Sequence, residues 1–431
     1  MTRNAEVALL LAASVVAATG TALVNFSSGV GLDAQVAVTF LSFGAAFGMV
    51  HVALRRWAPT ANPLLFPLAA FLAAIGITEL YRLDPVQGGY QRWSLIVAGA
   101  GAAAVIFLLR EEGVVVLRRF RYLFLAASVL LLLLPLLPDA WPIHGATVNG
   151  SRLWVRLDLP FGEGSLSFQP GEIAKLMLTV FLASYLADRH GALATTSRRV
   201  AGISLPEPRQ LGPIIIAAAA AFGVLVYQRD LGASLLLFVL FVGMMFLATG
   251  KAAYPLVGLI LVVAGGVFSY QVFDHVQRRV TAWLNPFGDF ADTGFQVAQG
   301  LFALGSGSLT GSGLGLGEPY RIPAATTDFV FAAVAEEMGL AGSIAVITGF
   351  ALLVAVGFGI ALRTRDVFRK FLAAGLTLVL GVQAVLIIGG VLRLLPVTGI
   401  TLPFMSYGGS SLLANMVLLA LVARISHGAR G

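Results

Sequence analysis

The chain contains no cysteine and few charged residues, and these absences exclude several classes of protein. Without cysteine it has neither a disulfide framework nor a thiolate metal site. Charged residues make up 11% of its 431 residues, whereas a soluble domain carries roughly 25%. The five histidines lack metal-ligand spacing, which argues against a histidine-bound zinc. No GxxxxGK[ST] sequence occurs, so a P-loop for ATP is absent as well.

Long hydrophobic runs are what the sequence has instead. Hydrophobic residues make up 58% of the chain, and runs of about 18 or more apolar residues recur from end to end. This pattern predicts an all-α polytopic membrane protein with about 12 transmembrane helices, large extracytoplasmic loops and one integral membrane domain over residues 1–431. The expected spans are 5–26, 34–54, 63–81, 94–109, 122–138, 172–187, 212–227, 231–249, 252–273, 328–360, 371–393 and 409–426.

The distribution of Lys and Arg predicts the orientation. With a cytoplasmic N-terminus, 18 of the 28 Lys and Arg residues fall on cytoplasmic loops, as the positive-inside rule requires. Both termini are then cytoplasmic, and the long loops 139–171 and 274–327 are external. The net charge of +7 follows from this topology, so we expect no nucleic-acid partner.

The stretch RIPAATTDFVFAAVAEEMG places carboxylates at the mouth of a predicted span and inside it. Asp328 is interpreted in two ways, as the N-cap of a helix or as a functional group. Glu336 and Glu337 lie further along the same span, with Glu336 about 12 Å deeper at 1.5 Å per residue. Ionisable groups inside a span usually face a bundle interior or a wet cavity. A structural bond to Ser, Thr or backbone is the alternative for either glutamate.

A second group of polar residues lies in NGSRLWVRL and SFQPGEIAKL. Glu172 falls in the first turn of a predicted helix, and Lys175 is placed to pair with it on one face. Arg152 and Trp154, just upstream, are suited to hold a phosphate and to stack on a sugar. The alternative is a well-formed helix start with a snorkelling lysine.

Two glycine-rich stretches complete the polar segments. GSGSLTGSGLGLGEPY, residues 305–320, has neither the preceding strand nor the lysine of a phosphate loop, so we interpret it as a flexible outer loop. LPVTGITLPFMSYGGSS, residues 395–411, contains too many prolines and glycines for a regular helix. It is expected to be an outer or re-entrant segment lining a protected cavity.

Taken together, five ordered stretches resemble the SEDS family, the RodA/FtsW/SpoVE group of peptidoglycan polymerases. They are SFQPGEIAKL, RDLGASLLL, GFQVAQGLFALGSGSLTGSGLGLG, AATTDFVFAAVAEEMGLAG and LPVTGITLPFMSYGGSSL. The resemblance covers roughly residues 90–427. Residues 1–85 would then be extra N-terminal spans with a connecting helix, most similar to a longer RodA-type subgroup.

The resemblance implies a peptidoglycan glycosyltransferase. Such an enzyme polymerises lipid II, an undecaprenyl-pyrophosphate-linked disaccharide peptide, at the outer face of the bacterial cytoplasmic membrane during elongation. A class B penicillin-binding protein transpeptidase and membrane lipid are the implied partners. A division-specific FtsW-type polymerase, a lipid II flippase or transporter, and a scaffold that only recruits a transpeptidase are the alternatives.

The resemblance also implies roles for individual residues. Asp328 matches the aspartate of the family's TDF motif and would be the catalytic base. No metal ligand is assigned, and a divalent cation (Mg or Mn) at the pyrophosphate is left open. Four positions depart from the family pattern, namely Leu153, Gly171, Arg229 and Thr326. The substrate-binding candidates are Arg152, Trp154, Glu172, Lys175, Arg279, Arg321 and Glu336.

Overall fold

The computed structural model describes residues 2–111, 113–138, 141–148, 151–158, 165–195, 198–200, 203–205, 208–290 and 294–428. The chain divides into two compact units. One comprises residues 1–110, 266–357 and 383–431, and the other comprises residues 111–265 and 358–382. The chain passes from one unit to the other four times, so each unit combines segments that are distant in sequence.

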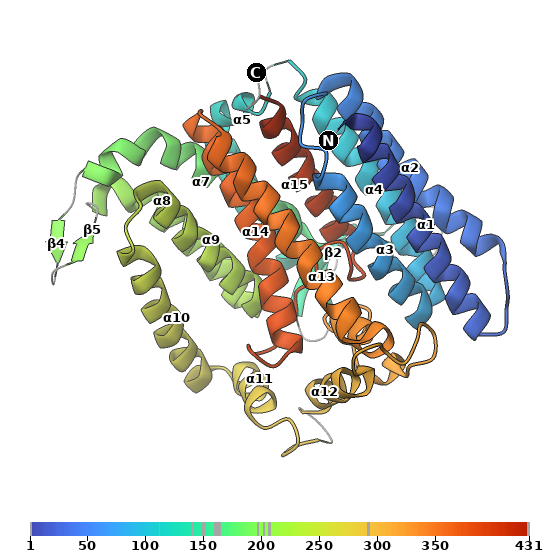
Figure 1. The fold of residues 1–431 in the computed structure, drawn as a ribbon. Coiled ribbons are helices and arrows are strands. Elements are labelled where there is room, and N and C mark those ends of the chain that lie inside the picture. Colours follow the sequence, from blue (N-terminus) through green and yellow to red (C-terminus); the bar gives the residue numbers. More distant parts are fainter. Residues whose placement is uncertain are drawn as a thin grey trace. The chain divides into compact units, whose positions relative to one another are not determined.

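The first unit is a bundle of long apolar helices (Figure 1). Its elements are α1 (Arg3–Ser27), α2 (Ala34–Trp57), α3 (Leu65–Leu83), α4 (Pro85–Leu108), α11 (Asp274–Leu284), α12 (Phe295–Gly307), η2 (Pro319–Arg321) and α15 (Gly409–Gly428). Helix α4 packs against both α2 and α15, and α1 packs against α2 and α3. Two further helices, α13 (Val330–Arg363) and α14 (Val367–Val391), contribute residues to both units.

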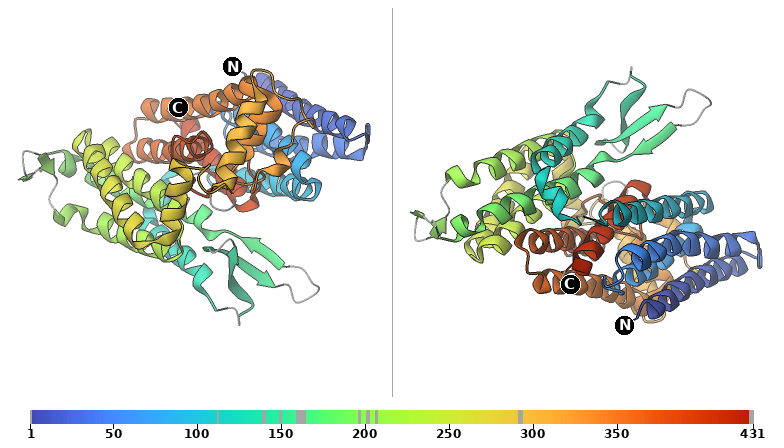
Figure 2. Two further views of the ribbon diagram at one scale, coloured as in Figure 1. Left: turned by 90° about the horizontal axis from the view of Figure 1, so that it is seen from below. Right: turned by 90° about the horizontal axis from the view of Figure 1, so that it is seen from above.

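The second unit combines helices with two small sheets (Figure 2). Its helices are α5 (Val115–Arg119), α6 (Arg121–Leu133), η1 (Leu134–Leu136), α7 (Pro170–Thr195), α8 (Pro208–Tyr227), α9 (Leu231–Thr249) and most of α10 (Ala253–Val272). Its strands are β1 (Ile143–Val148), β2 (Ser151–Asp158), β3 (Ser165–Phe168), β4 (Arg198–Val200) and β5 (Ile203–Leu205). The antiparallel sheet β1–β2–β3 extends away from the helices of the same unit.

Ten of the twelve predicted membrane helices are confirmed among the described residues. Each of the twelve expected spans coincides with a helix, and ten helices in the described part of the chain are long and apolar enough to cross a membrane. The other two expected spans, 122–138 and 212–227, form α6 with η1 and α8. The protein is therefore an all-α polytopic membrane protein. The sheets in loops 139–171 and 196–207 are additions that the prediction did not contain.

One helix begins well before its predicted span. The span was expected at 94–109, but α4 begins at Pro85. Asp84 caps it, because its Oδ1 accepts hydrogen bonds from the backbone N–H groups of Val86 and Gln87 at 2.9 and 3.1 Å. Proline at the first helical position has the backbone angle that a helix needs. The early start places Gln91 and Arg92 inside a packed helix.

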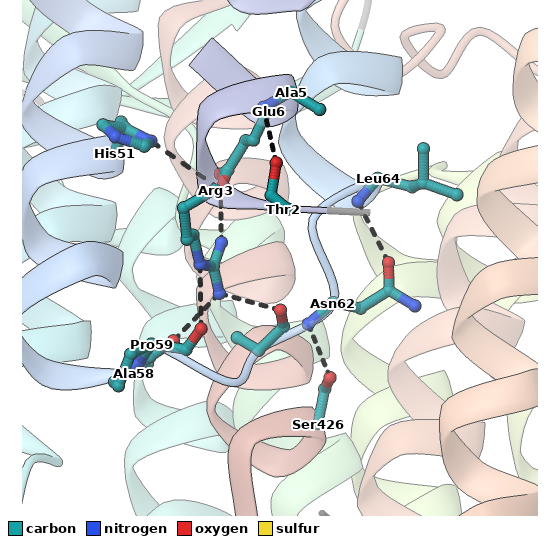
Figure 3. A network of polar contacts seen from close by, with 11 residues as sticks. Thr2, Arg3, Ala5, Glu6, His51, Ala58, Pro59, Asn62, Leu64 and Ser426 are labelled. Atoms are coloured by element: carbon teal, nitrogen blue, oxygen red, sulfur yellow. Dashed lines mark hydrogen bonds and ion pairs between the residues drawn. The ribbon is translucent and has the colours of Figure 1, made fainter.

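The N-terminal helix is tied to the bundle by a buried polar network (Figure 3). The Arg3 guanidinium donates to the Glu6 carboxylate and to three carbonyls of the α2–α3 loop. Glu6 is fully buried, and its Oε2 lies 3.6 Å from Nδ1 of His51 on α2. The network holds the start of α1 against the end of α2. The three accepting carbonyls belong to Ala58, Pro59 and Ala61.

Candidate active site

Asp328 lies in the turn that leads into α13. The side chain is half-buried and lies two residues before Val330, the first residue of α13. The carboxylate points toward Gly399 of the segment between α14 and α15. A Cβ built on Gly399 would lie 3.7 Å from Oδ2 of Asp328. The aspartate therefore faces a backbone position that leaves room for it.

Arg279 on α11 lies against the same glycine. A Cβ on Gly399 would lie 3.3 Å from NH2 of Arg279, and Gly399 has a φ of +76°. The NH1 group of Arg279 donates to the carbonyls of Val397 and Thr398 at 3.2 and 2.9 Å. The structure thus brings together two of the residues selected from the sequence, a carboxylate and a cation, against one glycine.

Helix α11 is fixed over this segment by a second arginine. Nε of Arg393 donates to the carbonyl of Trp283 at 2.7 Å, and NH2 donates to the carbonyl of Leu284 at 2.7 Å. In return, the Trp283 indole N–H donates to the carbonyl of Arg393 at 3.0 Å. These bonds satisfy carbonyls at the C-terminal end of α11, where a helix leaves them unpaired. They fix the position of α11, and therefore of Arg279, relative to the segment that Asp328 faces.

The cavity beside Asp328 is small, with a volume of about 10 Å³. That volume suits roughly one water molecule and no sugar ring. Apart from Asp328, its walls are the end of α14 and the segment that follows. The lining residues are Leu386, Ile387, Gly390, Val391, Val397, Thr398, Gly399 and Ile400.

The segment between α14 and α15 is irregular and largely buried, as its prolines and glycines predict. Residues 402–406 are buried although they form no helix. The Ser406 hydroxyl donates to the carbonyl of Thr327 at 2.5 Å, and the Tyr407 N–H donates to the carbonyl of Thr326 at 2.8 Å. These contacts satisfy backbone groups that would otherwise be buried without hydrogen-bond partners. They also anchor the turn that carries Asp328.

Gln91 of α4 clasps the same segment from its other side. Its Nε2 donates to the carbonyl of Ser406 at 3.1 Å, and its Oε1 accepts from the N–H of Gly408 at 3.1 Å. The Gln91 side chain is fully buried. A bidentate amide of this kind fixes a loop because both bonds must break before the loop can move.

Replacement of Gln91 by leucine is expected to weaken both stability and activity. The change leaves a buried carbonyl and a buried N–H without partners, at a cost of about 1–3 kcal/mol for each such group. Thermal unfolding of the purified protein measures the loss. Gln87→Leu is the matched control, because Gln87 bonds only to Asp84 one turn away. Equal unfolding temperatures for the two variants would contradict the clasp.

Glu336 and Glu337 hold the glycine-rich loop. Oε1 of Glu336 accepts from the N–H of Glu318 at 2.7 Å, and Oε2 of Glu337 accepts from the N–H of Gly315 at 2.8 Å. The Glu336 carbonyl also accepts from the Ser312 N–H and hydroxyl at 2.9 and 3.0 Å. Stretch 305–320 is therefore pinned to α13, in contrast to the flexible loop expected from its composition.

Arg82 of α3 adds two contacts to this group. We call Arg82, Glu336 and Glu337 together the glutamate clamp. Its Nε lies 3.2 Å from Oε1 of Glu337, and its NH2 donates to the carbonyl of Gly317 at 3.0 Å. The Glu337 side chain is fully buried, so its charge is paired where water cannot solvate it. Both glutamates form the bonds to backbone that the structural alternative expects, and substrate binding by Glu336 stays a prediction.

Helix α13 is broken where the clamp ends. Gly339 has φ 65° and ψ −163°, which interrupts the helical hydrogen-bond ladder. Loop residues fill the gap: the Gly313 N–H donates to the carbonyl of Glu337, and the Leu340 N–H donates to the carbonyl of Ser308. The glycine-rich loop thus supplies hydrogen-bond partners for the broken helix, and the break fixes the loop.

In the second unit, Glu172 and Lys175 form the predicted pair. Lys175 Nζ lies 2.7 Å from Oε2 of Glu172, with both side chains at most 10% exposed. NH2 of Arg152 donates to the carbonyls of Leu137 and Gly145 at 2.8 and 3.4 Å, which ties β2 to η1 and β1. Trp154 pairs with Ala146 across the β1–β2 ladder.

Two groups near the loop segments have altered ionisation. A hydrogen bond with Tyr320, and then the charge of Glu318, raise the pKa of the exposed Arg321, which therefore stays cationic. Nε of Arg321 lies 3.0 Å from Oε2 of Glu318. Burial raises the pKa of the Tyr407 hydroxyl, so that group stays neutral at physiological pH.

Several of these positions were not selected from the sequence. Arg82, Gln91, Trp283, Arg393 and Gly399 each act through partners that are far away along the chain. For Arg82 and Gln91 a signal was available, because both are polar residues within or beside predicted apolar spans. In the described part of the chain no three His, Asp or Glu side chains converge on a metal site.

The fold and the site define a class of protein. It is a polytopic membrane protein in which a carboxylate at a helix mouth and an arginine flank an irregular buried segment, with a broken helix alongside. Residues 94–431 match the family model described as "Cell cycle protein", which covers FtsW, RodA and SpoVE. The chain belongs to this FtsW/RodA/SpoVE family.

Individual relatives agree with the family model. "Peptidoglycan glycosyltransferase RodA" of Mycobacterium tuberculosis is 40% identical over 440 residues, covering 99% of this chain and 91% of that protein. "Probable peptidoglycan glycosyltransferase FtsW" of a Geobacter species is 36% identical over 313 residues, covering 72% and 79%. A solved chain from "Structural coordination of polymerization and crosslinking by a peptidoglycan synthase complex" superposes with a TM-score of 0.67 at 29% identity, covering 86% and 98%.

Proposed function

We propose that this protein is a peptidoglycan glycosyltransferase that polymerises lipid II during cell elongation. The observation that carries the proposal is the placement of Asp328 and Arg279 against Gly399, in a chain that is 40% identical to a RodA over nearly its whole length. The FtsW relative covers 72% of the chain, which favours the elongation role over the division role.

The chemistry requires a base and a stabilised leaving group. A sugar hydroxyl oxygen attacks the anomeric carbon of the donor, the bond from that carbon to the pyrophosphate oxygen breaks, and the pyrophosphate leaves with its electron pair. The Asp328 carboxylate takes the hydroxyl proton as the new glycosidic bond forms. Arg279 supports this step by fixing the carbonyls of Val397 and Thr398 beside the carboxylate.

We also propose that the site faces the extracytoplasmic side of the membrane. The excess of Lys and Arg, 18 of 28, on one set of loops supports cytoplasmic termini and an extracytoplasmic site. Lipid II presented at that face would supply the substrate. A class B penicillin-binding protein would crosslink the product, in keeping with the synthase complex that supplied the solved relative.

A lipid II flippase is the second candidate. Broken helices with polar residues are a feature of transporters, and α13 is such a helix. In α13, however, loop residues of the same chain occupy the break, with the N–H groups of Ser312 and Gly313 bonded to the carbonyls of Glu336 and Glu337. A transported substrate would have to displace these bonds, so the observation favours the polymerase.

Incubation of labelled lipid II with the purified protein and its penicillin-binding partner tests the proposal. Glycan polymer that grows with time is the expected product. If lipid II crosses the vesicle membrane and no polymer forms, the protein is a flippase and the polymerase proposal is wrong. Depletion in cells separates the two polymerase roles: rounded cells are expected for elongation, whereas long undivided filaments would indicate division.

The pair Glu172 and Lys175 gives a prediction that separates structure from function. Lys175→Met should destabilise the protein by about 3–5 kcal/mol, because it leaves a buried carboxylate without its cation. The double variant Glu172→Gln/Lys175→Met removes both charges and should recover most of that stability. If the pair contacts substrate, the stable double variant forms little polymer. A double variant that is both stable and active would limit the pair to a structural role.

A further inference from the structure

A groove between α2 and α4 lies outside the proposed catalytic region. It has two connected compartments, with volumes of about 560 and 490 Å³. They share four lining residues, Gln35, Gly89, Arg92 and Trp93. All lining residues except Ile96 precede residue 94, where the family match begins. The groove is thus a feature of the N-terminal helices.

The first compartment is polar and lies at the ends of four helices. Arg92 is 6% exposed and donates only to neutral acceptors, the carbonyl and Oε1 of Gln35 at 3.3 and 2.6 Å and the Thr39 hydroxyl at 2.9 Å. Its guanidinium also lies over the Tyr81 ring, 5.5 Å from the centroid. Among the described residues, no carboxylate lies within ion-pair distance of Arg92. A buried cation in this state is complementary to an anionic group.

Asp33 supplies a second polar feature of the same compartment. Its Oδ1 caps α2 by accepting from the Gln35 N–H at 2.9 Å, and it also accepts from Nδ2 of Asn25 at 2.7 Å. The compartment therefore contains a cation, Arg92, and a separate carboxylate, Asp33. A headgroup with a phosphate toward Arg92 and a hydrogen-bond donor toward Asp33 matches this arrangement.

The second compartment is apolar and runs along the helices. Val38, Leu41, Ala45 and Ile96 line it, and Leu41 is 64% exposed. From Gln35 to Ala45 the groove follows α2 for about 15 Å at 1.5 Å per residue. A hydrocarbon chain fits such a groove, since burying each CH₂ group is favourable.

Aromatic residues mark the depth of the groove. Tyr90 lines the polar compartment and is 61% exposed, and Trp93 lines both compartments and is 70% exposed. Tyrosine and tryptophan gather at the boundary between headgroups and hydrocarbon. The polar compartment is then at headgroup level, and the apolar one extends into the bilayer.

We propose that this groove binds a membrane phospholipid, with its phosphate at Arg92 and one acyl chain along Val38, Leu41 and Ala45. The site is next to the catalytic region, because Gln91, the neighbour of Arg92 on α4, clasps Ser406 and Gly408. A bound lipid would join the N-terminal hairpin α1–α2 to α4. The proposal does not depend on the reaction that the protein catalyses.

The test is native mass spectrometry of the full-length protein in detergent with added dioleoyl phosphatidylethanolamine. Gly89→Phe fills the shared part of the groove, where a Cβ would meet only NH2 of Arg92, at 3.8 Å. Gly44→Phe is the control, at an exposed position on α2 that lines neither compartment and has nothing within 4 Å of an added Cβ. We expect wild type and Gly44→Phe to retain the lipid and Gly89→Phe to bind it about tenfold more weakly.

Two further probes identify the chemistry. Dioleoylglycerol, which has the same chains and no phosphate, should bind about tenfold more weakly than the phospholipid. Inorganic phosphate alone should not displace the lipid. Equal retention by Gly89→Phe, equal binding of dioleoylglycerol, or displacement by inorganic phosphate would each overturn the proposal. The last result would indicate a site for a free anion.

Discussion

Asp328→Asn is expected to lower glycan polymerisation by about 10²–10⁴-fold, the usual contribution of a general base. The amide has nearly the shape of the carboxylate, so it should fit beside Gly399, where a Cβ would lie 3.7 Å from Oδ2. It cannot accept the proton of the attacking hydroxyl. Polymer formed from labelled lipid II, measured with the partner present, gives the rate. The unfolding temperature should stay close to that of wild type.

A second aspartate provides the control for this change. Asp366 is exposed at the start of α14, where its Oδ1 accepts from the N–H of Arg369 at 2.8 Å. Asp366→Asn makes the same chemical change beside a helix start and should leave polymerisation unchanged. If Asp328→Asn and Asp366→Asn form polymer at the same rate, Asp328 acts in the structure of the turn and another group is the base.

The membrane-spanning helices of this protein could be predicted from the sequence because each one contains a continuous apolar run. The short helices α11 and α12 were not predicted, since they lie within the expected external loop 274–327. Boundaries were harder where capping residues decide them. Asp84 and Pro85 start α4 nine residues before the apolar run begins at 94, so Gln91 and Arg92 lie outside the expected span 94–109. The strand SRLWVRLD has apolar residues at Leu153, Val155 and Leu157. This period-2 pattern is typical of a strand, but the stretch was interpreted as a loop.

The catalytic candidate could be found from sequence, but its surroundings could not. Asp328 was selected because it matches the aspartate of the family's TDF motif, since an aspartate before an apolar run is by itself a common N-cap. Its neighbour Gly399 and the clasp residue Gln91 are 71 and 237 positions away by their numbers, and no local pattern links such distant positions. Glu336 and Glu337 were noticed for their charge, whereas their backbone partners in the glycine-rich loop depend on the break in α13.

Gly339→Ala is expected to destabilise the protein by about 2–6 kcal/mol, the sum of backbone strain and overpacking. Gly339 has φ 65° and ψ −163°, a conformation open almost only to glycine. An added Cβ would lie 2.3 Å from the N atom of Gly311 and 2.8 Å from the carbonyl oxygen of Leu309. The Leu309 carbonyl accepts from the Ala341 N–H of α13 at 3.3 Å, and the Gly311 N–H donates to the Gly307 carbonyl at 2.8 Å. Neither backbone atom can therefore move aside separately.

The same helix offers a matched control for this prediction. Gly359 has nothing within 4 Å of an added Cβ, so Gly359→Ala should be neutral or slightly stabilising, as alanine is in a helix interior. Thermal unfolding in detergent compares the two variants, and polymerisation should fall only in Gly339→Ala. Similar stability would mean that loop 307–313 can leave α13 without cost. The bonds from Glu336 and Glu337 to the loop would then follow from the position of the loop and would not determine it.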